Sequence, residues 1–512
     1  MTGFFCISRR QNPAGRRGRL LPLVAAVAAF LFVRPSLIPA QTSPAFASGP
    51  PLPTLPVARS PFILRAINDP VTGKGSFSYL GQDIPPVIQA SPGQDIRISY
   101  LNRMSSHSTE QCVDGRCMNM TNLHFHGLHV SPNSPQDDVI SMMATPGGSL
   151  HYRVEIPFDQ PPGLYWYHTH PHGESYQQSL DGMSGAIVID GIDRYVPEVR
   201  SMKERILVLR DAELRHDADS LAREKLVQLS TQRCSASTDQ PERIFTVNGV
   251  VRPSIGIAPG ERQFWRIVNA SPDLYADLTI DSEQITVVAL DGMPLAYHDP
   301  ARRTETFQHV FLAPAGRVEA IVTGPKVGIQ SSLRTSCIDT GSDGDPNPAM
   351  VLADLDTSAH TRTPVASVVA SREAAVYKPL SGAQLNRYKS RPLDYSVKFT
   401  EDKQGFYIND HKYSPTDGPM ITVRLGYQHW RIVNATHELH PFHIHQVHFL
   451  AYEANEKPED HPEWLDTVNV PAEGSVDLVM DFTDPIIRGM SVFHCHLLKH
   501  EDKGMMAKIQ FK

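Results

Sequence analysis

One six-residue segment occurs twice in this 512-residue chain. The sequence Trp-Arg-Ile-Val-Asn-Ala occupies residues 265–270 and again residues 430–435, each time a few residues after a glycine. A diverged third copy, Gly-Gln-Asp-Ile-Arg-Ile-Ser-Tyr-Leu-Asn, occupies residues 93–102. The spacing of about 165 residues is too long for solenoid repeats, which run roughly 20–50 residues, and is typical of duplicated β-sandwich domains. The repeat therefore predicts three similar domains.

The local pattern around these copies is that of an all-β protein. Short β-branched segments, such as residues 96–101 and 184–189, are bounded by glycine, proline or aspartate. The 42 prolines and 33 glycines favour many short strands and turns, and no long stretch keeps a helical period. We place the domains at residues 62–195, 200–357 and 385–512, with a linker at residues 358–384 that is rich in alanine, serine and threonine.

The N-terminal segment has the pattern of a secretory signal. Five arginines between residues 9 and 19 precede an apolar run at residues 20–33, and small residues around Ala45 or Ala40 offer cleavage sites. We therefore predict a signal peptide at residues 1–47 and a Pro-rich tether at residues 48–61. The apolar run is short for a membrane span, so we expect a periplasmic or secreted protein without a stable span after cleavage. An uncleaved anchor is the alternative.

The cysteine count agrees with export. Cys6 would leave with the signal, and the remaining cysteines are Cys112, Cys117, Cys234, Cys337 and Cys495. The first four of these could form two disulfides in any of three pairings. An odd cysteine in an exported protein needs an explanation, and metal ligation of Cys495 would supply one. The net charge of −7 gives no reason to expect nucleic acid binding.

The motif around Cys495 has the composition of a metal site. His494 and His496 flank the cysteine, and His500 and Met505 follow. On an extended strand, neighbouring side chains point to opposite faces, so Cys495 would face one way and the two flanking histidines the other. One further histidine would complete a site of two histidines, one cysteine and a weak axial methionine, which is typical of copper. The alternative is a buried free cysteine in a histidine-rich strand.

Histidines spaced as His-x-His occur in the first and third predicted domains. The four pairs are His124 and His126, His168 and His170, His443 and His445, and His494 and His496. On a strand each pair presents both imidazoles on one face, and eight imidazoles suffice for three metal ions. His440, three residues before His443, would face the other way and complete the Cys495 site. A closed zinc site needs only four ligands, so copper is favoured over zinc. We interpret the remaining histidines, His129 and His448 among them, as ordinary.

These four motifs, in this order, resemble those of the multicopper oxidases, in particular the bacterial three-domain laccase-like branch. The resemblance implies three cupredoxin-like Greek-key β-sandwich domains and four copper ions: one type 1, one type 2 and two type 3. By motif position it implies the following ligands: His440, Cys495, His500 and Met505 for type 1; His124 and His443 for type 2; His126, His168 and His496 for one type 3 ion; and His170, His445 and His494 for the other. The middle domain carries no such motif and is expected to shape the assembly.

The resemblance also implies an activity. We expect an oxidase that couples one-electron oxidation of phenols or aromatic amines to the reduction of dioxygen to water, with Cys495 and its flanking histidines on the electron path. Oxidation of cuprous or other metal ions, with a role in metal tolerance, is the alternative, although the 15 methionines are scattered. Non-enzymatic copper binding is a third possibility. Glu501 and Asp137 match acidic proton-relay positions of the family, and Asp138 leaves the second alignment open.

Overall fold

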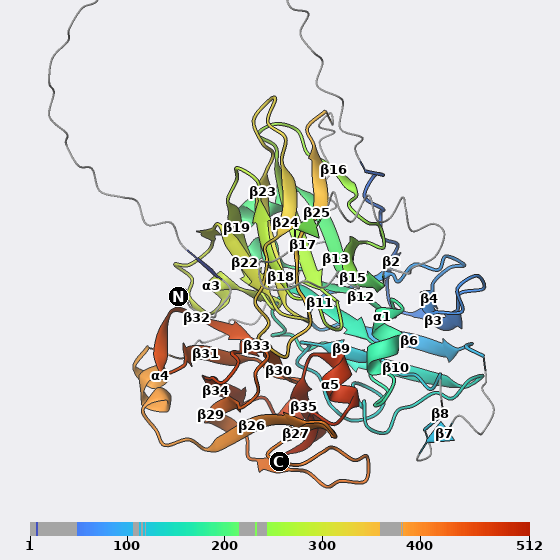
Figure 1. Cartoon of the computed structure of the whole chain (residues 1–512), viewed down its shortest axis with the longest axis vertical. Helices are drawn as coiled ribbons and strands as arrows, with labels where there is room; N and C mark the ends of the chain where they lie inside the picture. Colours follow the sequence, from blue (N-terminus) through green and yellow to red (C-terminus); the bar gives the residue numbers. More distant parts are fainter. Residues whose placement is uncertain are drawn as a thin grey trace, which may run out of the picture.

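The computed structural model describes residues 7–8, 49–105, 112–113, 116–117, 119–213, 231–232, 243–358, 380 and 382–512. Within these residues the chain is mostly β-sheet, as the sequence predicts, and its larger sheets form three packed pairs (Figure 1). We call these pairs the first, middle and third domains, in chain order. In the described part of the chain no helix has the length and apolar character that crossing a membrane requires.

The first domain contains two sheets. One has the order β10-β6-β3-β4, and the other has the order β2-β5-β12-β11-β9. Their strands are β2 (Val57–Ala58), β3 (Phe62–Asn68), β4 (Gly75–Ser78), β5 (Val87–Ala90), β6 (Asp95–Asn102), β9 (His124–His126), β10 (Ser149–Glu155), β11 (Gly163–His168) and β12 (Ser184–Ile189). A separate hairpin joins β7 (Cys112–Val113) to β8 (Arg116–Cys117).

The middle domain also contains two sheets. One has the order β15-β13-β17-β23-β19-β20, with β21 beside β19, and the other has the order β1-β22-β18-β24-β25-β14, with β16 beside β25. Their strands are β1 (Ile7–Ser8), β13 (Lys203–Glu213), β14 (Thr231–Gln232), β15 (Arg243–Val247), β16 (Ser254–Gly256), β17 (Arg262–Asn269), β18 (Ala276–Ile280), β19 (Ile285–Leu290), β20 (Met293–Pro294), β21 (Glu305–Phe307), β22 (His309–Leu312), β23 (Arg317–Thr323), β24 (Ser332–Thr335) and β25 (Ala349–Asp356).

The third domain also contains two sheets. Its sheets have the orders β27-β26-β29-β34-β31-β32 and β28-β36-β35-β30-β33. Their strands are β26 (Tyr395–Asp402), β27 (Gly405–Ile408), β28 (Ile421–Val423), β29 (Gly426–Asn434), β30 (His440–Ile444), β31 (Phe449–Ala454), β32 (Lys457–Leu465), β33 (Thr467–Val470), β34 (Ser475–Phe482), β35 (Gly489–Cys495) and β36 (Met506–Phe511).

Short helices lie between the strands. They are α1 (Ser175–Leu180), η2 (Ile192–Arg194), η3 (Pro197–Ser201), α3 (Leu295–His298), α4 (Gly382–Lys389), η4 (Pro485–Ile487) and α5 (Leu498–Asp502). Helix α4 covers the end of the predicted linker. Strand β2 lies within the predicted tether and pairs with β5, so this extended segment is part of the first domain's sheet. Strand β1 lies in the predicted signal peptide and pairs with β22.

The repeated segment occupies the same place in each domain. Its copies form β6, β17 and β29, and each pairs in parallel with the first long strand of its domain and antiparallel with a later one. The asparagine has the same role in all three copies: the side-chain amides of Asn102, Asn269 and Asn434 each donate to two backbone carbonyls. The asparagine therefore ends the strand and fixes the loop that follows.

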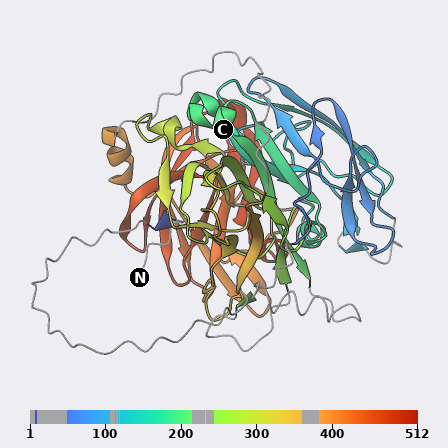
Figure 2. The same cartoon turned by 90° about the horizontal axis from the view of Figure 1, so that it is seen from above.

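The three domains pack against one another around a common centre (Figure 2). One buried apolar cluster runs through the middle and third domains, and another joins Trp166 of the first domain to Val268 of the middle domain. Strands β9 and β11 of the first domain and strands β30 and β35 of the third domain carry the histidine motifs to this centre.

Candidate metal centres

A sulfur and two nitrogens converge in the third domain. Cys495, at the end of β35, is fully buried, and its Sγ lies 3.3 Å from Nδ1 of His440 at the start of β30. Nδ1 of His500, in α5, lies 3.3 Å from that nitrogen and 4.0 Å from the sulfur. Met505 is also fully buried, and its carbonyl accepts the N–H of Cys495 at 3.1 Å. The strand alternation predicted for Cys495 and His440 is the one that brings these atoms together.

The protonation states of His440 and Cys495 suit the binding of a soft metal cation. Nε2 of His440 contacts Oγ1 of Thr436 at 2.8 Å, which leaves the Nδ1 lone pair toward the sulfur. Burial lowers the pKa of His440 to about 3 and raises the pKa of the Cys495 thiol. A neutral imidazole pair beside a buried thiol has the donor set of a copper ion, since thiolate and imidazole are the ligands that copper prefers. His440, Cys495 and His500 are close enough to hold one ion.

The outer edge of His500 is the part of this site closest to the surface. The ring stacks on Phe406, with 3.9 Å between ring centroids, and retains 6% of its exposure. Its Nε2 lies 3.4 Å from Oε1 of Glu438. Burial and the hydrogen-bonded carboxyl of Glu401 raise the pKa of Glu438 to about 9. The carboxyl groups of Glu438 and Glu401 therefore lie beside His500, which is more exposed than His440.

The eight remaining motif histidines form one buried cluster between the first and third domains. They are His124, His126, His168, His170, His443, His445, His494 and His496, each at most 2% exposed. Rings from the two domains stack in pairs: His124 on His445 at 3.7 Å and His126 on His443 at 3.8 Å between centroids. Pairing between neighbouring strands positions other rings of the cluster, because His168 lies opposite His124 and His494 lies opposite His443.

The nitrogens of this cluster are arranged as ligands. Nδ1 of His494 donates to the Cys495 carbonyl, so its Nε2 carries the lone pair and faces Nε2 of His170 at 3.3 Å and of His445 at 3.2 Å. Nε2 of His124 and of His168 have no hydrogen-bond partner. Burial lowers the pKa of His168 to about 3 and of His494 to about 4, so these rings are neutral. Buried lone pairs aimed at one another, with no proton between them, fit metal ions.

The two predicted relay acids both contact this cluster. Asp137 is buried and lies 3.0 Å from Nδ1 of His124, and its carboxylate accepts from the amide of Gln446 at 2.7 Å. Burial raises the pKa of Asp137 to about 8. Asp138 instead accepts the N–H of Ser141 in a local turn, so the structure separates the two adjacent acids.

Glu501 approaches the cluster from the side of α5. It is fully buried and accepts a hydrogen bond from Oγ of Ser175 at 3.0 Å. Its two oxygens lie 3.5 Å from Nδ1 of His170 and 3.4 Å from Nδ1 of His494. Burial raises the pKa of Glu501. It thus contacts two histidines of one predicted type 3 set.

Comparison with known protein families finds matches in two separate parts of the chain. Two multicopper oxidase family models match, one at residues 70–193 and one at residues 379–512. Together they span about half of the chain and contain all four histidine motifs. The chain belongs to the multicopper oxidase family.

Individual relatives are distant but cover most of the chain. A multicopper oxidase of Staphylococcus haemolyticus is 23% identical over 451 residues, which is 85% of this chain and 85% of that protein. A laccase of Bacillus stratosphericus is 23% identical, over 84% of this chain and 89% of that protein. A solved multicopper oxidase from Campylobacter jejuni, described as a metallo-oxidase, has a TM-score of 0.66 at 24% identity and covers 91% of this chain and 96% of its own. At this identity the structural likeness shows the shared fold.

Membership defines the cofactor and the reaction class. This multicopper oxidase has cupredoxin-like β domains and binds four copper ions: one type 1, one type 2 and two type 3. It is a copper-dependent oxidoreductase that uses dioxygen. The donor sets described above fit that complement.

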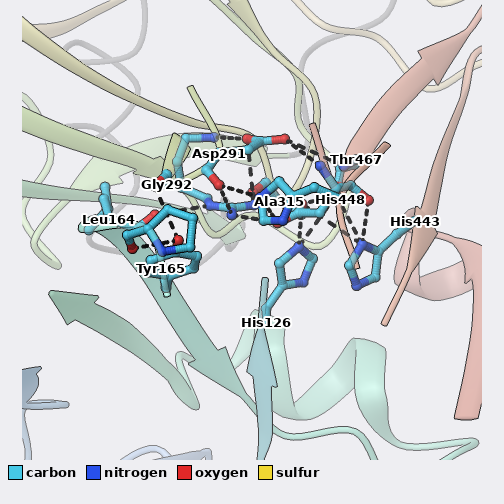
Figure 3. Close-up of polar contacts among 12 residues, drawn as sticks. His126, Leu164, Tyr165, Asp291, Gly292, Ala315, His443, His448 and Thr467 are labelled. Atoms are coloured by element: carbon cyan, nitrogen blue, oxygen red, sulfur yellow. Dashed lines mark hydrogen bonds and ion pairs between the residues drawn. The ribbon is translucent and has the colours of Figure 1, made fainter. Parts of the chain in front are cut away.

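Sequence reasoning missed a charged group at the centre of the oxidase. Asp466, between β32 and β33, is fully buried, and its Oδ1 lies 3.1 Å from Nε2 of His126 (Figure 3). Its carboxylate is paired with Arg317 of the middle domain. Burial raises the pKa of Asp466, but the charge and hydrogen bonds of Arg317 outweigh burial and lower this pKa below its ordinary value. The available signal was one aspartate in an otherwise apolar run, Trp-Leu-Asp-Thr-Val at residues 464–468.

Two histidines interpreted as ordinary lie next to this group. Nε2 of His129 lies 2.6 Å from Nδ1 of His448, and Nε2 of His448 donates to the Asp291 carbonyl at 2.8 Å.

Among the cysteines considered for disulfides, Cys337 is disulfide-bonded and Cys112 lies opposite Cys117 in the β7–β8 hairpin, whereas Cys234 lies outside the described residues. Cys495 is a free cysteine, as its proposed role requires.

Proposed function

We propose that this multicopper oxidase is laccase-like, oxidising phenols or aromatic amines one electron at a time at the edge of His500. The type 1 copper would be held by His440, Cys495, His500 and Met505. The type 2 copper would be held by His124 and His443, and the type 3 coppers by the two sets of three histidines given above. When bound, the coppers supply one-electron transfer and the reduction of dioxygen.

The chain's own contribution is a short covalent connection. Cys495 is bonded through the backbone directly to His494 and His496, whose rings belong to the eight-histidine cluster on the opposite face of the strand. The Cys495 thiolate and the histidine cluster are therefore attached to the same short piece of backbone, which holds them at a fixed separation.

The surroundings of His500 carry the substrate proposal. Phe406 stacks on the imidazole and offers an apolar face on which a flat aromatic ring could pack. Glu438 lies beside Nε2 and, at its raised pKa, is protonated and hydrogen-bonded to Glu401. As the electron leaves, Glu438 could accept the hydroxyl proton of a phenol and pass its own proton to the Glu401 carboxylate. The laccase of Bacillus stratosphericus supports the same substrate class.

A specific observation favours a second candidate, the oxidation of metal cations. Glu438 and Glu401 form a hydrogen-bonded acidic pair next to His500, and the carboxylate of Asp345 adds to the negative field around Glu438. Carboxylates suit hard cations such as ferrous ion better than cuprous ion, which prefers thioethers. The metallo-oxidase from Campylobacter jejuni supports this alternative.

Oxygen uptake measured in parallel with a phenol, ferrous ion and cuprous ion separates these candidates. The laccase-like proposal requires phenol oxidation by the fully copper-loaded enzyme without added copper. If that enzyme ignores phenols and oxidises ferrous or cuprous ion rapidly, the metal-oxidase function takes its place.

We also propose that Asp137 and Glu501 supply protons to the cluster, because both are buried and both contact cluster histidines. Export to the periplasm or the medium is a further proposal, supported by the arginine-rich and apolar pattern of residues 9–33. Cell fractionation with N-terminal sequencing of the mature protein tests it, and a cytoplasmic protein with an intact N-terminus would contradict it.

A further inference from the structure

The middle domain places one cation at the junction of all three domains. Arg317, the first residue of β23, is fully buried, and its guanidinium donates twice to Asp466 of the third domain, from Nη1 to Oδ1 at 2.7 Å and from Nη2 to Oδ2 at 2.5 Å. Its Nε donates to the carbonyl of Leu164 in the first domain at 3.3 Å. The carbonyls of Asp291 and Ala315 accept the remaining two N–H groups. All five donors of the guanidinium are thus used, so its orientation is fixed.

Asp466 in turn contacts a cluster histidine from each of two domains. Its Oδ1 accepts from Nε2 of His126, in the first domain, at 3.1 Å. Its backbone carbonyl accepts from Nδ1 of His443, in the third domain, at 2.8 Å. The hydroxyl of Thr467 donates to the same Oδ1 at 2.9 Å. Figure 3 shows the rings of His126 and His443 side by side, with Thr467 above them.

These contacts select which nitrogen each ring presents to the cluster. His126 donates through Nε2, so its Nδ1 keeps the lone pair, and this nitrogen has no hydrogen-bond partner. His443 donates through Nδ1 and leaves Nε2 without a partner. His168 and His494 donate through Nδ1 to carbonyl groups and also present Nε2. His126 therefore has the opposite tautomer to these rings, and the Asp466 carboxylate accounts for it.

We propose that Arg317 is a positioning residue for the trinuclear copper cluster. It holds the Asp466 carboxylate in one orientation, and Asp466 fixes the tautomers and ring orientations of His126 and His443. This inference rests on the ligand assignment proposed above. It gives the middle domain a direct part in the copper chemistry, beyond shaping the assembly as the sequence suggested.

The planar guanidinium is the feature that carries this role. A lysine at residue 317 would keep the positive charge but could not make two parallel hydrogen bonds to Asp466 while also donating to three carbonyls. Arg317→Lys therefore separates orientation from charge. Asp466→Asn is the companion change, since an amide has only one acceptor oxygen and its NH2 group cannot accept the second hydrogen bond from Arg317.

A matched control comes from the same sheet. Arg266, in β17, is also buried and forms ion pairs with Glu319 and Glu204. Its carboxylate partners lie in the middle domain, and among the described residues neither of these ion pairs involves a motif histidine. Arg266→Lys thus tests the loss of a buried guanidinium without disturbing Asp466.

The three variants are compared with the wild type by copper content per chain, blue absorption, the type 2 electron paramagnetic resonance signal and the near-ultraviolet type 3 band. We expect Arg317→Lys and Asp466→Asn to keep the blue absorption of the Cys495 site. Copper content should fall below the four ions of the wild type, and reoxidation by dioxygen should slow about 10- to 100-fold. Arg266→Lys should keep full copper content and wild-type spectra at a reduced Tm.

The outcomes distinguish this inference from the proposed function. A wild type without blue absorption or without its full copper content would overturn the ligand assignment itself. A normal wild type, with Arg317→Lys and Asp466→Asn that bind full copper and give wild-type type 2 and type 3 signals, would overturn the role of Arg317 alone. If these variants do not fold, a crystal structure of the copper-loaded wild type decides: copper on Nδ1 of His126 supports the inference, and copper on its Nε2 overturns it.

Discussion

Oε1 of Glu438 lies 3.4 Å from Nε2 of His500, while Nδ1 of the same ring faces the Cys495 sulfur 4.0 Å away. The carboxyl group and the sulfur are thus on opposite sides of one imidazole. Because His440 is fully buried, a reductant that reaches this site meets the edge of His500, with Glu438 beside it. The chemistry of Glu438 therefore bears on substrate choice.

We expect Glu438→Gln to slow phenol oxidation about 10-fold or more, because an amide, unlike the carboxyl of Glu438, cannot relay the hydroxyl proton to Glu401. Ferrocyanide gives up an electron without a proton, and the raised pKa of Glu438 keeps this carboxyl neutral, so the oxidation of ferrocyanide should be unchanged. Steady-state kcat/KM for both donors is the measurement. Asp345→Asn, at an exposed acid that pairs with Arg243 and Lys499, is the control. Equal losses for phenol and ferrocyanide would contradict a proton-accepting role.

Replacing the sulfur tests the type 1 assignment. Cys495→Ser should abolish both the blue absorption and the oxidase activity, because the hydroxyl does not provide a thiolate ligand. The side chain is fully buried and similar in size, so the copper-free protein should lose at most about 1–3 kcal/mol of unfolding free energy. Absorption spectroscopy and thermal unfolding measure the two effects. A Cys495→Ser protein that stays blue would place the type 1 copper elsewhere.

Strand periodicity explains why so much of the metal site was predictable. His-x-His spacing on an extended chain places both rings on one face. Strand β9 contains both histidines of its pair, whereas β11, β30 and β35 each contain the first histidine of theirs and end just before the second. The odd separation of His440 from His443 likewise placed His440 with Cys495, because the two faces of a strand alternate without exception along a regular stretch. The repeated Asn269 and Asn434 marked equivalent strands because their amides fix equivalent loops.

The parts that were missed depend on contacts between domains. Arg317 belongs to a domain without histidine motifs, and its partner Asp466 is 149 residues away in the chain. No local period links them, since the pairing arises only when three domains pack together. Asp137 and Asp138 could not be separated for a related reason: which of two adjacent acids faces His124 depends on how the chain leaves the first domain's sheet.

The adjacent acids now give a matched pair of variants. Asp137→Asn should slow reoxidation of the reduced enzyme by dioxygen about 10- to 100-fold, because the carboxylate that contacts His124 and Gln446 is lost. Asp138→Asn changes only the turn at Ser141 and should leave reoxidation near the wild-type rate. Stopped-flow mixing of reduced enzyme with dioxygen is the measurement. Similar rates for the two variants would remove Asp137 from the proton path.

A cluster histidine should behave differently from Cys495. His445→Gln removes a nitrogen that lies 3.2 Å from Nε2 of His494, yet leaves the Cys495 group intact. We expect the blue absorption to persist and a reductant to bleach it once, without recovery in air. His172→Gln, at a ring that packs on Tyr413 outside the cluster, is the control and should recover its colour. Rapid recovery in His445→Gln would exclude it from the dioxygen site.

Gly127 tests how tightly the Arg317–Asp466 pair is packed. It follows His126 with a φ of +85°, and a Cβ there would lie 2.5 Å from Nη2 of Arg317 and 2.5 Å from Oδ2 of Asp466. Gly147 has a similar φ of +83°, but a Cβ there meets nothing within 4 Å. Alanine at either position should cost about 1–3 kcal/mol of unfolding free energy from backbone strain.

Only Gly127→Ala should also force the ion pair apart, because buried Arg317 and Asp466 have no room to yield. We therefore expect Gly127→Ala to lose more unfolding free energy than Gly147→Ala and to bind less copper, with its blue absorption retained. Thermal unfolding of the copper-free proteins and copper analysis after loading measure both. Equal stability losses and full copper content in the two variants would mean that the pair tolerates displacement, and that His126 does not depend on its position.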